Sequence, residues 1–282
     1  MTTSVRTTPA PDTISTPDLL LPIRFRDLLL SEWTKLRSVR STMWALGTLV
    51  VATIGFTTLL TWLASSQWDT FTAVQKAAVL ADPTGQILGS GFQFSQLAVC
   101  VLGVLVMTAE YSTGTIRSSL LAVPRRTPML AAKALVFGAL VLVVAEATAF
   151  PSFFIGAAIL HSTAPVSLGD PGVLQAVIGA GLYAAVLGVF AVAVGAIVRH
   201  TAGAITGIIG FVLVLSPLAL LLPGTVGAHI HAYLPTVAGQ ALVTTVQGPD
   251  DLLSAWQGFG VFVLWTVGLL LVANYLLKRR DA

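Results

Sequence analysis

Charge is the scarcest property of this 282-residue sequence. Only 10% of the residues are charged, against about 25% in ordinary globular domains. Hydrophobic residues make up 55%, and the mean hydropathy is +0.88. This composition excludes a soluble fold and indicates an integral membrane protein. The net charge of +3 does not point to a nucleic-acid partner, because the basic residues cluster at the ends of apolar segments.

Signatures of catalysis and nucleotide binding are also missing. Cys100 is the only cysteine and lies in an apolar run, so neither a disulfide framework nor a cysteine metal site can form. None of the lysines follows a glycine, so the chain has no GxxxxGK[ST] phosphate loop, and no HExxH motif is present. An intramembrane aspartyl protease needs two carboxylates, but only Glu146 lies within a span. We therefore expect a chain that is not an enzyme and binds no cofactor or metal of its own.

Six apolar segments are each long enough to cross a hydrocarbon layer of about 30 Å as a helix. They cover residues 43–63, 87–109, 134–155, 173–198, 202–222 and 256–277. Residues 1–21 are rich in Thr, Ser and Pro and lack the apolar core of a secretory signal, so we expect a disordered cytoplasmic tail. Residues 22–282 are then expected to form one transmembrane domain.

The placement of lysine and arginine predicts the orientation of the spans. With six spans and a cytoplasmic N-terminus, every basic residue except Lys76 falls on the inner side. An odd number of spans would instead place Lys278, Arg279 and Arg280 outside. The sequence thus predicts a multi-pass protein of the cell membrane with both termini in the cytoplasm.

Two segments outside the spans have apolar patterns of their own. Within residues 22–40, one helical face carries Phe25, Leu29, Trp33 and Leu36, and Arg26, Asp27, Lys35 and Arg37 lie largely elsewhere. This pattern is typical of an amphipathic helix in the membrane interface, although an extension of the first span would also fit. Residues 224–248 contain no acid, lysine or arginine. They predict one or two short helices dipping into the outer leaflet and broken at Pro235, with a surface loop as the alternative.

The predicted fold class follows from these segments. It is an all-α integral membrane protein with six transmembrane helices, an N-terminal amphipathic interface helix and an outer re-entrant segment before the last span.

A polar segment, residues 110–128, interrupts the apolar pattern between the second and third spans. Its sequence, EYSTGTIRSSLLAVPRRTP, carries one acid and three arginines. The predicted orientation places it in the cytoplasm, in the one inner loop long enough to dock a partner. We interpret it as a docking loop, and an ordinary positive-inside loop is the alternative.

Glu146 is the one ionisable residue in the middle of a span. Such residues are costly in a membrane and are candidates for function. Glu146 either fixes the fold, for example through a bond to Thr148, or faces a substrate path, and the sequence leaves both open. Gln93 and Gln96 raise the same question more weakly, and hydrogen bonding between helices is the favoured interpretation for them.

Two further patterns have low specificity. His229 and His231 are two residues apart, which in a strand would turn both toward a metal. No Cys, Asp or Glu lies near them, so we interpret them as interfacial histidines. Gly203, Gly207 and Gly210 form a small-residue ridge that permits close helix approach and is a candidate subunit interface.

The docking loop resembles the cytoplasmic loop of ABC-2 type transporter permeases. The matching residues are Glu110, Gly114, Thr115, Arg117, Pro124 and Arg126. The opening stretch RFRDLLLSEWTKLRSVRSTMWAL is similar to the start of such permeases, notably those of high-GC Gram-positive bacteria. YLPTVAGQAL at residues 233–242 is similar to their outer re-entrant segment. The resemblance extends over about residues 20–282.

The resemblance implies the permease subunit of an ATP-driven exporter. The six matching residues would couple to a separate ATP-binding subunit, which would hold ATP and Mg, and a second permease subunit would complete a homodimer or heterodimer. The alternative is a channel or secondary transporter without an ATPase, for which several intramembrane charges or inverted repeats would be expected. A membrane enzyme acting on lipid would need a pair of catalytic groups, which the chain lacks. The sequence does not specify the transported substrate.

Overall fold

The computed structural model describes residues 24–115, 126–246, 248 and 251–279, and the structural statements below concern these residues. Their secondary structure is helical, without strands. The elements are α1 (Phe25–Ser38), α2 (Arg40–Ser66), a short 3₁₀ helix (Trp68–Thr70), α3 (Ala73–Ala81), α4 (Pro83–Ser112), α6 (Arg126–Leu160), α7 (Val173–Val198), α8 (Thr201–Leu220), α9 (Gly224–Ala232), α10 (Pro235–Gln240) and α11 (Ala255–Arg279). The predicted all-α fold is confirmed.

Six helices in the described residues are long and apolar enough to cross a membrane: α2, α4, α6, α7, α8 and α11. Each corresponds to one predicted span, although several helices extend beyond the apolar run. α4, for example, begins at Pro83 because Asp82 caps it, with the Asp82 carboxylate accepting a hydrogen bond from the Gly85 amide at 2.8 Å. Hydropathy detects the apolar part of a helix but not a polar end that is set by a capping residue.

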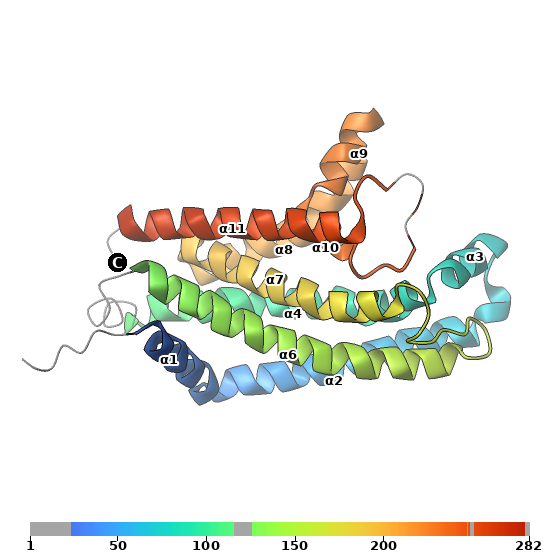
Figure 1. The fold of residues 1–282 in the computed structure, drawn as a ribbon, viewed down its shortest axis with the longest axis horizontal. Coiled ribbons are helices and arrows are strands. Elements are labelled where there is room, and N and C mark those ends of the chain that lie inside the picture. The colour runs from blue at the N-terminus through green and yellow to red at the C-terminus, as the bar shows by residue number, and fades with distance from the viewer. Residues whose placement is uncertain (1–23, 116–125, 247, 249–250, 280–282) are drawn as a thin grey trace, which may run out of the picture.

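α7 is the centre of the bundle. It is the most buried of the six spans and packs against α4, α6, α8 and α11, as the side-by-side ribbons in Figure 1 show. Its sequence is apolar on all sides, which is expected of a helix surrounded by other helices. Small residues bring α4 close to it, since a Cβ added at Gly103 would lie 2.7 Å from the Gly188 carbonyl oxygen.

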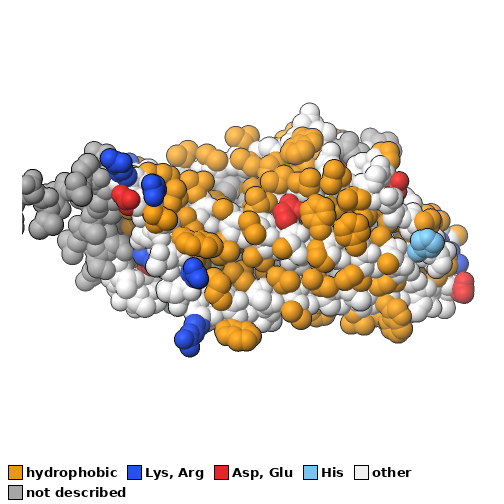
Figure 2. All heavy atoms as spheres, turned by 60° about the horizontal axis from the view of Figure 1, so that its bottom comes forward, with side chains coloured by type: hydrophobic (Ala, Val, Ile, Leu, Met, Phe, Trp, Pro, Cys, Tyr) orange, Lys and Arg blue, Asp and Glu red, His pale blue; other side chains and the backbone are white. Residues whose placement is uncertain are grey.

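The ends of α1 and α11 lie at the same end of the molecule (Figure 1). Lysine and arginine side chains gather at this end, and hydrophobic side chains cover the long middle (Figure 2). We call it the basic end. Lys76, on α3, lies at the opposite end of the bundle. The even number of spans brings α1 and the end of α11 to the same end of the bundle.

α1 is the predicted N-terminal helix, and part of its surface packs against the bundle. Glu32 and Leu36 are its buried residues, whereas Phe25 and Trp33 are 42% and 44% exposed. Lys35, which the sequence places largely off the apolar face, is partly buried. Acidic partners on α1 and α4 hold its ammonium group against the bundle.

The predicted outer re-entrant segment forms two short helices, α9 and α10. Pro235 is the first residue of α10, so the break falls where it was predicted. α10 packs against α11 and α7, while α9 contacts α8 and projects away from the rest of the bundle (Figure 1). The helix α3, between α2 and α4, was not predicted. It begins at a capping box formed by Thr72 and Gln75.

Candidate functional site

Four charged side chains meet at the basic end, and we call them the ionic cluster: Glu32, Lys35, Glu110 and Lys133. The Lys133 ammonium contacts Glu32 Oε2 at 2.6 Å and Glu110 Oε1 at 2.8 Å. The Lys35 ammonium contacts Glu32 Oε1 at 2.6 Å and Glu110 Oε1 at 3.0 Å. The cluster therefore joins α1, the end of α4 and the start of α6, which are distant in the sequence.

Most of this cluster is shielded from solvent. The Lys133, Glu32 and Glu110 side chains are 3%, 5% and 10% exposed, and only Lys35, at 40%, reaches the surface. Burial alone would lower the pKa of Lys35, but its hydrogen bonds to Glu32 and Glu110 and their charges outweigh this and raise the pKa. Two acids and two lysines balance in charge, which is the condition for keeping such groups buried.

The sequence identified Glu110 but missed Glu32 and Lys133 as its partners. Lys133 was counted only as an inner-side charge, although it stands alone in the apolar run MLAAKALVF. A lone lysine at the start of a span, combined with the Glu32–Lys35 spacing on the interface helix, is the signal that could have suggested this cluster.

The structure separates the predicted coupling residues. Glu110 is buried and contacts α1 and α6 of its own chain, whereas Gly114 and Thr115 are exposed just beyond the end of α4. Gly114 has a φ of 71°, which suits glycine. The Thr115 hydroxyl is 2.9 Å from that of Thr113.

The remaining predicted coupling residues come later in the docking loop. Arg117 and Pro124 lie outside the described residues, and Arg126 is the first residue of α6.

Glu146 lies midway along α6, next to α7. Its carboxylate packs directly over Gly181, where an added Cβ would collide with it. Glu146 Oε2 is buried without a hydrogen-bond partner in the described part of the chain. The suggested bond to Thr148 does not form, because that hydroxyl donates to the Val144 carbonyl at 2.7 Å. Figure 2 shows acidic side-chain atoms amid hydrophobic ones near the middle of the molecule.

A second polar group lies inside the bundle and involves the re-entrant segment. The Tyr183 hydroxyl on α7 donates to Gln96 Oε1 on α4 at 3.0 Å. The Gln240 amide on α10 donates to the same oxygen at 3.3 Å and to the Tyr183 oxygen at 3.4 Å. Gln96 thus makes the interhelical hydrogen bonds predicted for it, and these bonds fix α10 against α4 and α7.

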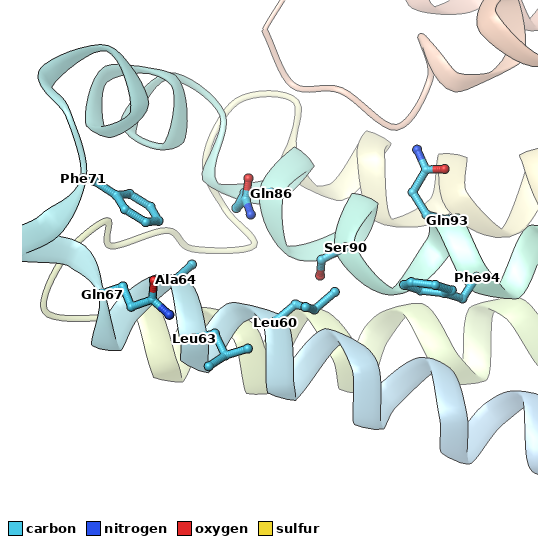
Figure 3. A pocket seen from close by; sticks show the side chains of 9 residues that line it. All are labelled: Leu60, Leu63, Ala64, Gln67, Phe71, Gln86, Ser90, Gln93 and Phe94. Atoms are coloured by element: carbon cyan, nitrogen blue, oxygen red, sulfur yellow. The ribbon is translucent and has the colours of Figure 1, made fainter. Parts of the chain in front are cut away.

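A cavity of about 500 Å³ lies between α2 and α4, toward the end of the molecule opposite the basic end. Figure 3 shows Leu60 and Leu63 of α2 facing Ser90 and Gln86 of α4 across it. Gln93, the second glutamine considered from the sequence, also lines this cavity and accepts a hydrogen bond from Gln96 at 3.1 Å. The walls offer amide and hydroxyl groups but no charged side chain.

The two histidines of the outer segment lie in helix α9, where residues two apart point about 200° apart. His229 Nδ1 is 2.7 Å from the Thr225 carbonyl oxygen, and His231 Nε2 is 3.2 Å from the Ser216 hydroxyl. The strand geometry that could have directed both histidines to one metal is therefore absent from this described segment.

The fold and the polar groups together define a multi-pass membrane protein with a charged, internally bonded basic end. The profile of the ABC-2 family transporter protein matches residues 32–282. This chain belongs to that family and is an ABC transporter permease. The match spans all six membrane helices and the second half of α1, and it confirms the resemblance recognised in the sequence. A search of curated proteins found no match.

Proposed function

We propose that the chain is one of two permease subunits of an ATP-driven exporter, powered by separate ATP-binding subunits. The observation that carries this proposal is the ionic cluster at the start of the docking loop. Glu110, the first residue of that loop, is bonded to Lys35 on α1 and Lys133 on α6. A force applied to the loop would therefore act on α1, α4 and α6 together.

Within this proposal the docking loop divides into two parts. Gly114, Thr115, Arg117, Pro124 and Arg126 form the part that contacts the ATP-binding subunit. Glu110 transmits the contact, because it is only 8% exposed and its partners belong to its own chain. The basic end faces the cytoplasm in this arrangement, as the placement of lysine and arginine favours.

The second permease subunit would pack against α8. Gly207 and Gly210 lie on this helix with no heavy atom within 4 Å of an added Cβ, so another helix has room to approach. We place the substrate path between the two permease subunits and beside the cavity of α2 and α4. Glu146 remains a candidate for this path or for fixing the fold.

Charge reversal at opposite ends of the molecule tests the proposed coupling. Arg117→Glu in the docking loop should abolish stimulation of the ATP-binding subunit and its co-purification with the permease. Lys76→Glu, on the exposed helix α3 at the other end, makes an equal change in charge. It should leave ATPase stimulation and co-purification unchanged. Normal stimulation with Arg117→Glu would refute the assignment of the docking loop.

Single-cysteine labelling tests the orientation. Cys100 is buried, so an added Thr113→Cys provides an exposed thiol against a low background. A membrane-impermeant maleimide should label it only from the cytoplasmic side. Labelling of intact cells from outside would reverse the orientation and with it the position of the docking loop.

A further inference from the structure

A second cavity lies beside the ionic cluster, between α1, α2 and α4. Its volume is about 570 Å³, within the range of about 300–1,000 Å³ typical of ligand pockets. One wall is apolar and comes from Ala45 on α2 and from Leu102, Leu105 and Val106 on α4. Leu105 is 38% exposed on the outside of the bundle, so this wall continues onto the surface that faces lipid.

The inner end of this cavity is charged and incompletely bonded. Glu110 lines it, and both lysines of the ionic cluster contact Glu110 Oε1. Glu110 Oε2 is buried and has no hydrogen-bond partner among the described residues. A buried carboxylate oxygen left without a donor is destabilising. A ligand that donates N–H bonds from a cationic group would satisfy this oxygen.

The mouth of the cavity carries groups that favour an anion. The Lys35 side chain lines it and is 40% exposed. Ser41 and Thr42 also line it and lie in the first turn of α2. The Thr42 N–H donates to the Val39 carbonyl at 3.0 Å, and the positive end of the helix dipole at this turn favours anions. The cavity thus combines an acceptor for a cation, a rim suited to phosphate and an apolar wall.

We propose that this cavity binds a membrane phospholipid whose headgroup carries a primary ammonium, such as phosphatidylethanolamine. The ammonium donates to Glu110 Oε2, and the phosphate lies against Lys35 and the first turn of α2. An acyl chain follows Leu102, Leu105 and Val106 into the bilayer. The lipid would then add a further link between α1 and α4, a role separate from ATP-driven transport.

The headgroup is tested with the full-length protein in nanodiscs that contain equal amounts of three lipids with identical acyl chains. The lipids are phosphatidylethanolamine, phosphatidylcholine, which has no N–H donor, and phosphatidylglycerol, which has no cation. Native mass spectrometry measures which lipid stays bound after release from the disc. We expect about tenfold more phosphatidylethanolamine than phosphatidylcholine, equivalent to ~1.4 kcal/mol. Equal retention of these two, or an excess of phosphatidylglycerol, would overturn the proposal.

A variant whose larger side chain fills the cavity provides the second test. Ala109 lines the cavity and is exposed, so Ala109→Phe should occupy the site without touching the four charges. Ala158→Phe is the matched control, since Ala158 is exposed on α6 near its opposite end and does not line the cavity. We expect Ala109→Phe to lose the bound phosphatidylethanolamine and Ala158→Phe to keep it. Retention in both variants would contradict the proposed site, and if Ala109→Phe unfolds, the headgroup comparison on the parent protein decides.

Discussion

Glu110 and Glu146 are both acids in membrane-spanning helices, yet their surroundings differ completely. Glu110, near the end of α4, contacts two lysines and is held in a neutral cluster. Glu146, at the middle of α6, packs over Gly181 and forms no ion pair within the described residues. Both acids have a buried Oε2 atom without a hydrogen-bond partner there, so the difference lies in the lysines that only Glu110 contacts. The comparison shows that depth alone does not define the role of a membrane acid. The groups on neighbouring helices determine whether such an acid is held in structural ion pairs or is left available for a functional role.

The largest expected effect is the removal of Lys133. Lys133→Met leaves Glu32 and Glu110 buried beside each other with only the half-exposed Lys35 to balance them. Breaking a buried ion pair in this way costs about 3–5 kcal/mol, which thermal unfolding in detergent would show as a large fall in Tm. Lys76→Met removes a lysine at the opposite end and should change Tm little. A Lys133→Met protein as stable as the parent would show that the ionic cluster contributes nothing to the fold.

A smaller effect is expected where Glu146 meets α7. Gly181→Ala places a methyl group against the Glu146 carboxylate, and overpacking of this kind costs about 1–3 kcal/mol. Gly55→Ala on α2 is the control, because an added Cβ there has no heavy atom within 4 Å. Combining Gly181→Ala with Glu146→Ala should recover the lost stability in the thermal unfolding assay. A double variant no more stable than Gly181→Ala alone would contradict this contact.

The third expectation separates the two acids directly. Glu146→Gln keeps the shape of the side chain and breaks no ion pair that the structure shows, so its stability should stay within about 1 kcal/mol of the parent. Glu110→Gln removes a charge that contacts two lysines and should destabilise more. Transport by Glu146→Gln should change if Glu146 lines the substrate path. A Glu146→Gln protein identical to the parent in both transport and stability would make Glu146 a bystander.

The smallest effect is the titration of Lys35. Its raised pKa means that the folded state holds the proton more tightly than the unfolded chain. The stabilisation is therefore complete below the ordinary pKa of 10.5 and is lost as pH rises through the higher folded value. Since Lys35 is partly exposed, the contribution is less than about 1 kcal/mol. Tm measured from pH 9 to pH 12 (an alkaline range spanning roughly this titration) should fall less steeply in Lys35→Met than in the parent, and parallel curves would argue against this role.

The sequence predicted the six spans well because each span is a long apolar run with polar ends. It did not predict the helix ends set by Asp82 or the helix α3 that begins beside Thr72, since caps depend on short local bonds outside those runs. It selected Glu110 but not the ionic cluster. The four charges come from three separate segments, and no local spacing relates residue 110 to residues 32 and 133. Local signals can mark Lys133 and the Glu32–Lys35 pair individually, but only the packing of α1, α4 and α6 shows that they meet Glu110.

Beyond Glu110, α4 carries two more polar attachments along its length. Gln96 bonds α10 and α7 near the middle, and Asp82 at the start of the helix accepts a hydrogen bond from the Thr245 amide at 3.3 Å as well as one from its hydroxyl. A helix of 30 residues is about 45 Å long, so pivoting it by ~5° about one end moves the other end by ~4 Å. Hydrogen bonds of about 3 Å do not survive such a shift unless their partners move too. If α4 tilts from the ionic cluster, it must either carry α10 and the chain around Thr245 with it or break its hydrogen bonds to them. A movement at the basic end would in this way reach the opposite end of the bundle through α4.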